Sequence, residues 1–401
     1  MDGSPTATPG ERIDQLVGRH AALLSERLQA HRAQLFTPDA KKTLRTFTSG
    51  EVAALLGVKD AYLRKLDLEG KGPRPEVKAG RRHYTPQDIL SLRHTLEAGA
   101  KQKGTYLPGR RRQGDHCQVI AVINFKGGSG KTTTAAHLAQ KAALDGYRVL
   151  GVDLDPQASF SGLHGVLPEI DLAEGGTLYD AIRYDAPRPL AEVIQQTYFT
   201  GLDIVPGNLE LMEFEHDTPR ALAAGDGEGG LFFTRIGDAL GQVEAAYDIV
   251  VLDCPPQLGF LTMSALSAAT AVLVTVHPQM LDVMSMGQFL LMTSNLLAVV
   301  AEAGGNMDYD WLRYVVTRYE PSDGPQTQMV AFLRSMFGAH VLTNAVLKST
   351  AIADAGITKQ TLYEVDKGQF TRATYDRART SLDAVNAEIT QLIQQAWGRG
   401  A

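Results

Sequence analysis

The stretch that most constrains this chain is INFKGGSGKTTTAAHLAQ, residues 123–140, where an apolar strand enters a glycine turn and a helical pattern leaves it. The glycines let backbone amides converge on phosphate oxygens, and the helix N-terminus adds its positive end. Lys131 can reach the β- and γ-phosphates, and Thr132 can hold Mg²⁺. The stretch predicts an ATP and Mg²⁺ site made of Gly127, Gly128, Ser129, Gly130, Lys131, Thr132 and Thr133. A glycine turn that binds nothing is disfavoured because the strand and the helix are both in place.

Two further aspartates are expected to complete the chemistry. Asp155 follows the strand VLGVD in a loop where a carboxylate can orient a water against the γ-phosphate. On the residues alone, a turn aspartate explains Asp155 equally well. Asp253 ends the buried strand IVVLD, from which proteins with such loops hold the Mg²⁺ shell. The predicted metal residues are therefore Thr132 and Asp253, and the predicted catalytic residues include Lys131, Asp155 and Asp253.

Beyond residue 117 the hydrophobic pattern predicts the fold class. Short apolar runs alternate with longer helical stretches, which indicates α/β architecture with a mostly parallel sheet flanked by helices. The expected strands are VIAVINF, YRVLGVD, LDIVPG, DIVVLD, AVLVTV, LRYVVT and VLTNAVL. Residues 289–301 are expected to form a buried helix, and residues 371–397 one long helix.

Charge is divided unevenly along the chain. The net charge is −6, but residues 1–113 hold 21 Lys and Arg against 12 Asp and Glu, or +9, and the remainder holds 18 against 33, or −15. DNA contact is electrostatically favoured in the basic part. Two cysteines are too few for a disulfide framework or a thiolate zinc site, and the start of the chain lacks a secretory pattern, so a cytoplasmic protein is expected.

The basic part has its own organisation. Residues 1–10 are expected to be disordered, and residues 11–37 to form an amphipathic helix with a possible dimerisation role. Residues 43–100 are predicted to form a winged helix-turn-helix domain. Ser49 is expected to cap its first helix, and a second helix is expected to start near Lys59. Thr85 is expected to cap a third helix with Pro86 at its first position. Residues 101–116 are expected to be a linker, followed by an ATPase domain over residues 117–401.

The predicted helix-turn-helix supplies candidate DNA contacts. Tyr62, Arg64 and Lys65 lie on its second helix, and Arg81 and Arg82 on the extended segment after it. This arrangement suits operator binding through groove and phosphate contacts. The alternative is a solvated basic face.

The phosphate loop departs from the literal Walker pattern because Phe125 stands where that pattern has glycine. Lys126-Gly-Gly-Ser-Gly-Lys-Thr resembles the deviant Walker A motif of the ParA/MinD family of P-loop ATPases. The resemblance covers most of residues 118–365 and includes HPQMLDVMSM, VVTRYEP and AVLKSTAIADAGITKQTLYE. It implies a homodimer in which Lys126 reaches the partner subunit's nucleotide, and it assigns the water-positioning role to Asp155.

The resemblance also implies contacts outside the phosphate loop. Thr317 and Arg318 are expected near the base, as is the turn at 353–356, and which residues contact adenine stays open. Arg334 and Lys348 are expected to bind DNA without sequence preference, although both can also be ordinary surface charges. Within the family, the N-terminal unit and the stretches DVMSM and TLYEVDK favour the partition ATPases of RepABC replicons.

The function implied is plasmid partition. ATP closes a dimer, the dimer binds nucleoid DNA, a ParB-type centromere-binding protein stimulates hydrolysis, and the N-terminal domain represses its own operator. The alternative is a nucleotide-responsive transcriptional repressor without a motor role. An electron carrier is disfavoured because Cys117 and Cys254, the two cysteines of the chain, are not at suitable positions to ligate a cluster between two subunits. Membrane attachment is disfavoured because the C-terminal helix carries little positive charge. His137 and His277 are interpreted as structural histidines.

Overall fold

The computed structural model describes residues 12–35, 42–107, 114–172, 176–224, 231–305 and 307–399. Its contacts divide the chain into two units, residues 1–43 and 44–401. The expected tail at residues 1–10 lies outside the described residues. The first unit contains helix α1 (Ile13–Leu35), which displays exposed Ile13, Val17 and Leu24.

The second unit is built on a seven-stranded sheet of order β10-β9-β4-β8-β5-β7-β6. All neighbouring strands are parallel except β6 and β7, which pair antiparallel. The strands are β4 (Gln118–Ile123), β5 (Val149–Asp153), β6 (Gln195–Gln196), β7 (Leu202–Val205), β8 (Ile249–Asp253), β9 (Ala271–Val276) and β10 (Trp311–Val316). The expected α/β fold is confirmed.

Alternate residues of each strand feed two hydrophobic cores. In β4, Ile120 and Val122 enter one core, whereas Val119, Ala121 and Ile123 enter the other. Side chains of a strand point alternately to opposite faces, so a strand apolar at every position must be covered on both sides. This explains why the strands read as unbroken apolar runs.

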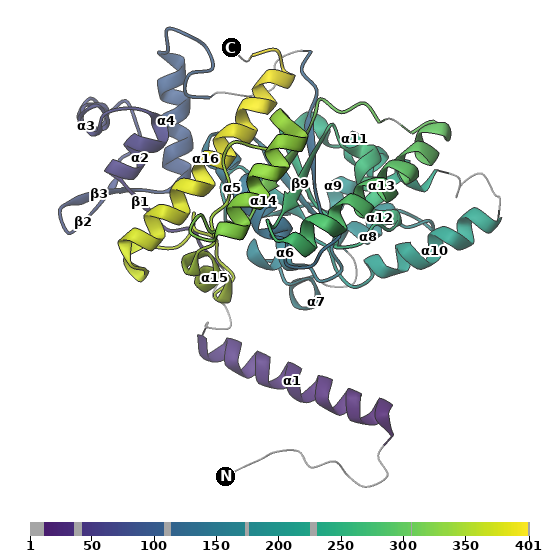
Figure 1. Cartoon of the computed structure of the whole chain (residues 1–401). Helices are drawn as coiled ribbons and strands as arrows, with labels where there is room; N and C mark the ends of the chain where they lie inside the picture. Colours follow the sequence, from purple (N-terminus) through teal and green to yellow (C-terminus); the bar gives the residue numbers. More distant parts are fainter. Residues whose placement is uncertain are drawn as a thin grey trace. The chain divides into compact units, whose positions relative to one another are not determined.

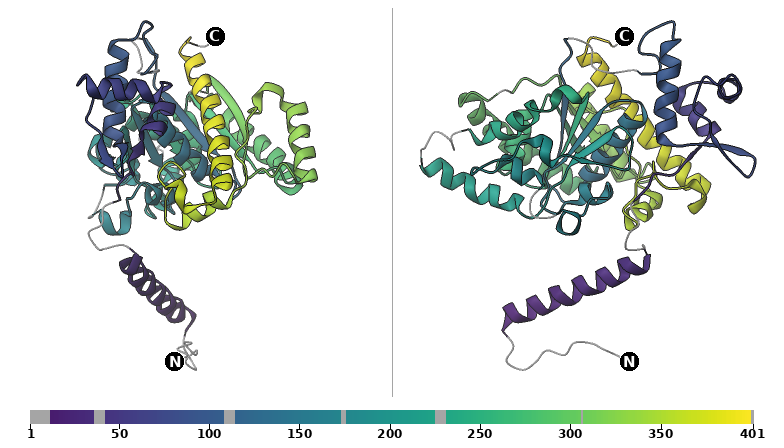
Figure 2. Two further views of the ribbon diagram at one scale, coloured as in Figure 1. Left: turned by 90° about the vertical axis from the view of Figure 1, so that its left-hand side faces the viewer. Right: turned by 180° about the vertical axis from the view of Figure 1, so that it is seen from behind.

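Helices cover both faces of the sheet (Figures 1 and 2). On one face α5 (Lys131–Leu144), α15 (Thr350–Ile357) and α16 (Arg372–Ala396) contribute to the first core. On the other lie α8 (Leu178–Ile182), α10 (Leu211–Ala224), α11 (Arg235–Gly241), α12 (Phe260–Ala268), α13 (Met280–Glu302) and α14 (Gly324–Phe337). The shorter elements are α6 (Ser159–Leu163), α7 (Pro168–Asp171), α9 (Leu190–Val193) and the 3-10 turns η1 (Phe232–Thr234), η2 (Glu244–Ala246), η3 (Gly338–His340) and η4 (Lys367–Gln369). The predicted C-terminal helix is confirmed as α16.

Residues 47–98 form a winged helix-turn-helix. Its elements are β1 (Phe47–Thr48), α2 (Ser49–Leu56), α3 (Asp60–Leu68), β2 (Glu76–Lys78), β3 (Arg81–Tyr84) and α4 (Pro86–Ala98). The antiparallel hairpin β2–β3 is the wing, and β1 pairs with β3. Gly57 turns the chain after α2 with a φ of 64°, a left-handed conformation that favours glycine.

The caps of these helices follow the sequence with one correction. Thr85 caps α4 with Pro86 at its start, as expected, and Asp88 completes a capping box. Thr48, and not Ser49, caps α2, because Glu51 lies three residues after Thr48 and its carboxylate accepts the Thr48 amide at 2.9 Å. In a capping box, the two residues that exchange hydrogen bonds are three positions apart, and Thr48 is the residue at that distance from Glu51.

Two expected elements of the ATPase part differ in the structure. VLTNAVL, residues 341–347, is not a strand and makes only isolated bridges to Tyr314 and Tyr319 among the described residues. The Glu388 carboxylate accepts the amides of Thr343 and Asn344 instead of a ladder partner. Helix α13 is not a buried helix, because only a narrow stripe including Met286 and Phe289 packs on the sheet.

The remaining surface of α13 is apolar and exposed at several positions, among them Met280, Leu281, Met284 and Leu291. Among the described residues, α13 is the one helix whose length and composition would allow it to cross a membrane. A helix that packs on a core can meet the same criteria, and α13 packs on the sheet through Met286, Phe289 and Val300.

Residues 101–107 form turns against α4. The carboxylate of Glu97 accepts the amides of Tyr106 and Leu107 at 2.9 and 3.1 Å, and the amide of Gly104. Residues 108–113 of the predicted linker lie outside the described part of the chain. Side chains of α2, α3 and α4 also join those of α5 and α16 in one continuous core. The winged-helix and ATPase parts are therefore packed together.

Candidate nucleotide site and DNA-binding surfaces

The glycine loop lies between the end of β4 and the start of α5. Gly128 and Gly130 have φ of 77° and 86°, which turns the backbone around the loop. The Asn124 carboxamide accepts the Lys126 amide at 2.8 Å and donates to the Thr275 carbonyl of β9. The Ser129 hydroxyl bonds that of Thr275 at 3.0 Å. Contacts with β9 therefore hold the loop in place. Asn124 and Thr275 were not among the residues predicted from the sequence.

Lys131 is buried at the first turn of α5, and its ammonium donates to the Lys126 carbonyl at 3.3 Å. Burial lowers the pKa of Lys131, and the Asp253 and Asp155 carboxylates oppose that shift. A buried cation needs anionic partners. A polyphosphate in the loop would supply them.

Asp153 and Asp253 end the neighbouring strands β5 and β8 and are paired in register. Burial, with the other carboxylate nearby, raises the pKa of Asp253. Burial likewise raises the pKa of Asp153, but its oxygens accept hydrogen bonds from Ser161 and from the Asp155 amide. By distance and angle, neither oxygen of Asp253 accepts a hydrogen bond among the described residues, although the nearby Thr132 hydroxyl opposes the rise in the pKa of Asp253. An orphaned buried carboxylate beside the loop fits a residue that completes a hydrated Mg²⁺ shell.

Asp155 is half-buried in the loop after β5. Its carboxylate accepts the Gln157 amide at 3.0 Å, which is the bond of a local turn. The second oxygen is left for other contacts in this arrangement, so the turn bond and a water-positioning role are compatible.

Thr317 and Arg318 lie against the phosphate loop. The Thr317 hydroxyl donates to the Ser129 carbonyl at 2.7 Å, and an Arg318 guanidinium nitrogen donates to the Gly128 carbonyl at 3.0 Å. Arg318 has a φ of 52°, a conformation rare for side-chain-bearing residues. The structure thus brings both residues to the loop backbone, where they support its shape.

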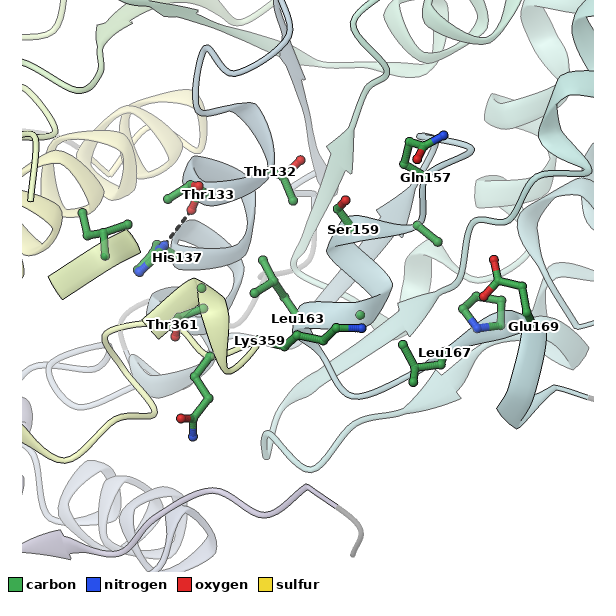
Figure 3. Close-up of a pocket in the computed structure, with 16 residues that line it drawn as sticks. Thr132, Thr133, His137, Gln157, Ser159, Leu163, Leu167, Glu169, Lys359 and Thr361 are labelled. Atoms are coloured by element: carbon green, nitrogen blue, oxygen red, sulfur yellow. Dashed lines mark hydrogen bonds between the residues drawn. The ribbon is translucent and has the colours of Figure 1, made fainter. Parts of the chain in front are cut away.

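A cavity of about 530 Å³ opens beside the start of α5. Figure 3 shows Thr132 on the side of α5 toward Ser159 and Leu163, and Thr133 beside His137. Lys359 also lines the cavity. Ile352, Gly356, Gln360 and Thr361 also line it. The cavity is large enough for a nucleoside. It places the 352–361 segment beside the phosphate loop. Residues 353–356 lie in this segment, but they belong to helix α15 and do not form the expected turn.

His137 ties this segment to α5. Its Nδ1 donates to the Thr133 carbonyl at 2.7 Å, and its Nε2 accepts the Leu362 amide at 3.2 Å, which requires the neutral ring. Burial lowers the pKa of His137 to about 4. Its structural role is consistent with the expected one, and its contacts add a link from α5 to the cavity wall.

We expect His137 to make the protein less stable as the pH falls from about 6.5 to about 4. In that window the unfolded chain binds a proton that the folded chain does not, which lowers the free energy of unfolding by up to about 3 kcal/mol. His137→Gln keeps a neutral donor and acceptor, so its unfolding free energy should fall less steeply over that range. Urea unfolding of both proteins at several pH values measures this, and identical slopes would contradict it.

Lys126 is turned toward α13. Its ammonium pairs with the Asp282 carboxylate, whose other oxygen lies 3.2 Å from His277 Nδ1. The Lys126 side chain is 47% exposed. The Phe125 ring packs against the Phe289 ring in a tilted arrangement, with centroids 5.2 Å apart and an interplanar angle of 31°. Phe125 and Lys126, the two residues that set this loop apart from the literal motif, therefore both contact α13.

The expected operator-binding residues lie on α3 and the wing. Tyr62, Arg64, Lys65 and Arg81 are exposed. Arg64 pairs with Asp60 at 2.8 Å, Lys65 with Glu69 at 3.6 Å, and Arg82 with Asp67 at 3.0 Å. Surface pairs are weak and can exchange for phosphate contacts.

Arg334 and Lys348 are both exposed in the ATPase part. Arg334 donates to the Thr343 carbonyl at 2.6 Å, and Lys348 pairs with Glu320 at 3.0 Å. Thr343 lies within the segment 341–347 and Lys348 directly follows it; Val341 of this segment bridges to Tyr314 of β10 and Leu347 to Tyr319. The structure thus brings the two cations to one region.

Comparisons with known proteins cover both parts of the chain. The family model described as AAA domain matches residues 117–301, and that described as MerR HTH family regulatory protein matches residues 47–98. A replication protein A from Sinorhizobium fredii is 55% identical, with 99% of this chain and 98% of the relative covered. The chromosome partitioning protein ParA of Myxococcus xanthus is 30% identical over 65% of this chain and 85% of its own.

A solved structure extends the comparison to the nucleotide site. The cobyrinic acid a,c-diamide synthase of Mycobacterium smegmatis, with bound ADP and magnesium, is 26% identical. It covers 60% of this chain and 94% of its own, with a TM-score of 0.50. Nucleotide and magnesium binding are thus found within this fold family. Together with the glycine loop and the winged helix-turn-helix, these matches show that the chain belongs to the ParA family of P-loop partition proteins and is of the RepA type.

Proposed function

We propose that this protein is an ATPase that partitions a low-copy replicon. ATP closes a homodimer, the dimer binds nucleoid DNA, and a ParB-type centromere-binding protein stimulates hydrolysis and release. The winged helix-turn-helix binds the protein's own operator. The observation that carries the proposal is the doubled lysine of the loop, with Lys131 buried at α5 and Lys126 held outside it by Asp282.

ATP and Mg²⁺ are the proposed ligands. Lys131 and the α5 amides would hold the β- and γ-phosphates, while Thr132 and the orphaned Asp253 would hold the metal, which neutralises charge on the phosphates. Asp155 would orient the attacking water. The 352–361 wall of the cavity would hold the base, with Thr317 and Arg318 acting through the loop backbone.

The dimer is proposed from the surroundings of Lys126. The exposed apolar residues Met280, Leu281 and Met284 share the first turns of α13 with Asp282. Such a patch favours association. On closure, Lys126 would exchange Asp282 for the γ-phosphate of the partner subunit. That exchange would link dimerisation to the presence of ATP.

Two DNA surfaces are proposed. Tyr62, Arg64, Lys65, Arg81 and Arg82 would bind the operator, where base contacts give specificity. Arg334 and Lys348 would bind nucleoid DNA through phosphates alone. The protein would therefore act in the cytoplasm, on the nucleoid.

The second candidate is a repressor that binds nucleotide as a ligand without a motor role, and the winged helix-turn-helix favours it. Turnover separates the two candidates. The partition hypothesis requires ATP hydrolysis stimulated by DNA together with the ParB-type protein encoded beside it. Absence of hydrolysis under those conditions, with operator binding intact, would favour the repressor.

For Lys126→Gln we expect ATP affinity within a few fold of the parent but loss of dimer closure and of stimulated hydrolysis by roughly 100-fold or more, because one charge-assisted contact to the γ-phosphate is removed. Sedimentation with a non-hydrolysable ATP analogue and phosphate release measure these. Lys367→Gln, an exposed lysine on η4, is the matched control and should behave as the parent. Parental dimerisation by Lys126→Gln would refute the role of Lys126 across the interface.

A further inference from the structure

A single buried arginine joins the winged helix-turn-helix to the helix that begins at the phosphate loop. Arg93 of α4 is 4% exposed. Its Nε donates to the Leu144 carbonyl at 2.9 Å and one Nη to the Tyr106 carbonyl at 2.9 Å. The other Nη donates to the Leu55 carbonyl at 3.1 Å and to the Asp145 carboxylate at 3.4 Å. One guanidinium thus binds α2, α5 and the turns after α4.

The contact lies at the C-terminal end of α5. Leu144 is the last residue of α5, and carbonyls at a helix C-terminus attract cations. Lys141 pairs with Asp145 and holds that carboxylate in place beside Arg93. Because a buried guanidinium has no water to bind, the loss of any of these acceptors is costly.

Gly146, directly after α5 and Asp145, leaves room for the Arg93 side chain. Gly146 has a φ of 94°, and a Cβ there would lie 3.0 Å from Arg93 Cδ and 3.1 Å from a Leu107 methyl. An alanine would therefore be strained by its backbone and would also push against Arg93. Two residues from different parts of the chain, Gly146 and Arg93, thus offer independent ways to disturb one contact.

One end of α5 lies at the predicted nucleotide site, and the other end contacts α4 of the winged helix-turn-helix. Its first turn carries Lys131, Thr132 and Thr133, the predicted phosphate and Mg²⁺ ligands, and its last residue meets Arg93. Fourteen residues span about 21 Å of stiff helix. A shift of α5 when phosphates bind would move the Leu144 carbonyl relative to Arg93.

The other side of Arg93 faces the DNA-binding elements. Leu55 lies in the last turn of α2, directly before the Gly57 turn that sets the angle to α3. Arg93 itself lies on α4, which follows the wing strand β3 after the Thr85 cap. A displaced Arg93 would therefore move α2 relative to α4, and with them the surfaces that are proposed to read DNA.

We propose that Arg93 couples occupancy of the nucleotide site to operator binding by the winged helix-turn-helix. The proposal rests on the proposed function for both ligands. Nucleotide binding changes the position of α5, Arg93 transmits the change to α2 and α4, and operator affinity changes. By thermodynamic linkage, operator DNA changes nucleotide affinity by the same factor.

The test compares the parent with Arg93→Lys and Gly146→Ala. The probe is a fluorescent duplex that covers the region upstream of the gene for this chain, titrated with and without a non-hydrolysable ATP analogue and Mg²⁺. A coupling of roughly 5- to 150-fold is typical of such systems. We expect the parent to show a ratio in this range and both variants a ratio near one, while their affinity in the absence of nucleotide stays close to the parental value.

Arg45→Lys is the matched control. Arg45 lies just before β1, and its side chain is 17% exposed. It contacts the winged helix-turn-helix, where it pairs with Glu51 at 2.8 Å and lies over the Phe47 ring. No hydrogen bond or ion pair described for Arg45 reaches the ATPase part. Its replacement should weaken local packing but keep the parental ratio, so a general loss of stability is distinguished from a loss of coupling.

Amide hydrogen exchange gives a readout that needs no DNA. In the parent, the ATP analogue should slow exchange in α2 and α4, and Arg93→Lys should lose that response while keeping the one in α5. A parental ratio or exchange response in both variants, or a parent without either, overturns the proposal. If the parent fails to bind the duplex but keeps the exchange response, the operator role fails and the coupling through Arg93 stands.

Discussion

Lys131→Ala is expected to weaken ATP binding by more than roughly 100-fold. The Lys131 ammonium is predicted to bind the β- and γ-phosphates. Its removal loses charge-assisted hydrogen bonds of about 1.5–3 kcal/mol each. Isothermal titration with a non-hydrolysable analogue measures the affinity. Thermal unfolding gives a second readout, since ligand at about 100 times its Kd stabilises the parent by about 2.7 kcal/mol.

The unliganded variant should be no less stable than the parent. Lys131 is 6% exposed and burial lowers its pKa, so the free protein bears the cost of a desolvated cation. Alanine removes that cost. An unliganded variant that melts well below the parent would mean that Lys131 is a structural residue, and retained ATP affinity would exclude its phosphate role.

Asp155→Ala is expected to leave ATP binding within a few fold of the parent and to slow hydrolysis by roughly 100- to 10,000-fold, the range for removing a group that positions or deprotonates a nucleophile. The protein should then stay as an ATP-bound dimer on DNA. Single-turnover phosphate release, with dimerisation measured in parallel, checks both parts.

Asp155→Asn distinguishes a role of the negative charge in hydrolysis from a role of the side chain in the local turn. Its carbonyl oxygen can still accept the Gln157 amide, so the local turn is kept while the negative charge is lost. If both variants are slow, the carboxylate acts on the water. If only Asp155→Ala is slow, Asp155 is a turn residue. Asp153 is a poor substitute for the role because its oxygens are occupied by Ser161 and the Asp155 amide.

Much of the fold could be predicted because local chemistry determines it. The unbroken apolar strands require a sheet covered on both faces, and six of the seven runs expected as strands contain strands of the sheet. The phosphate loop and the Thr85 cap depend on residues within a few positions of one another. The order of the strands and the antiparallel end at β6 could not be predicted, since pairing joins residues far apart in the sequence.

The errors have the same origin. VLTNAVL has the apolar pattern of a strand, yet in the described part of the chain only its Leu342 and Val346 amides bond to β10 carbonyls. The Glu388 carboxylate, 44 residues from Asn344, accepts the Thr343 and Asn344 amides between them. The α13 segment has the apolar content of a buried helix, yet only one stripe of it contacts the sheet. Apolarity shows that a segment can be buried, and the neighbours available in the fold decide how much of it is.

The phosphate loop, the aspartates at the strand ends and the helix-turn-helix could be predicted because each depends on residue types at short spacing. Their surroundings depend on the tertiary structure. In the folded chain, Lys126 pairs with Asp282, Thr317 donates to the Ser129 carbonyl, and Arg93 donates to the Leu144 carbonyl at the end of α5. These contacts join residues 51 to 188 positions apart in the sequence. Folding brings such groups together, since each buried polar group must find a partner wherever the packed chain offers one.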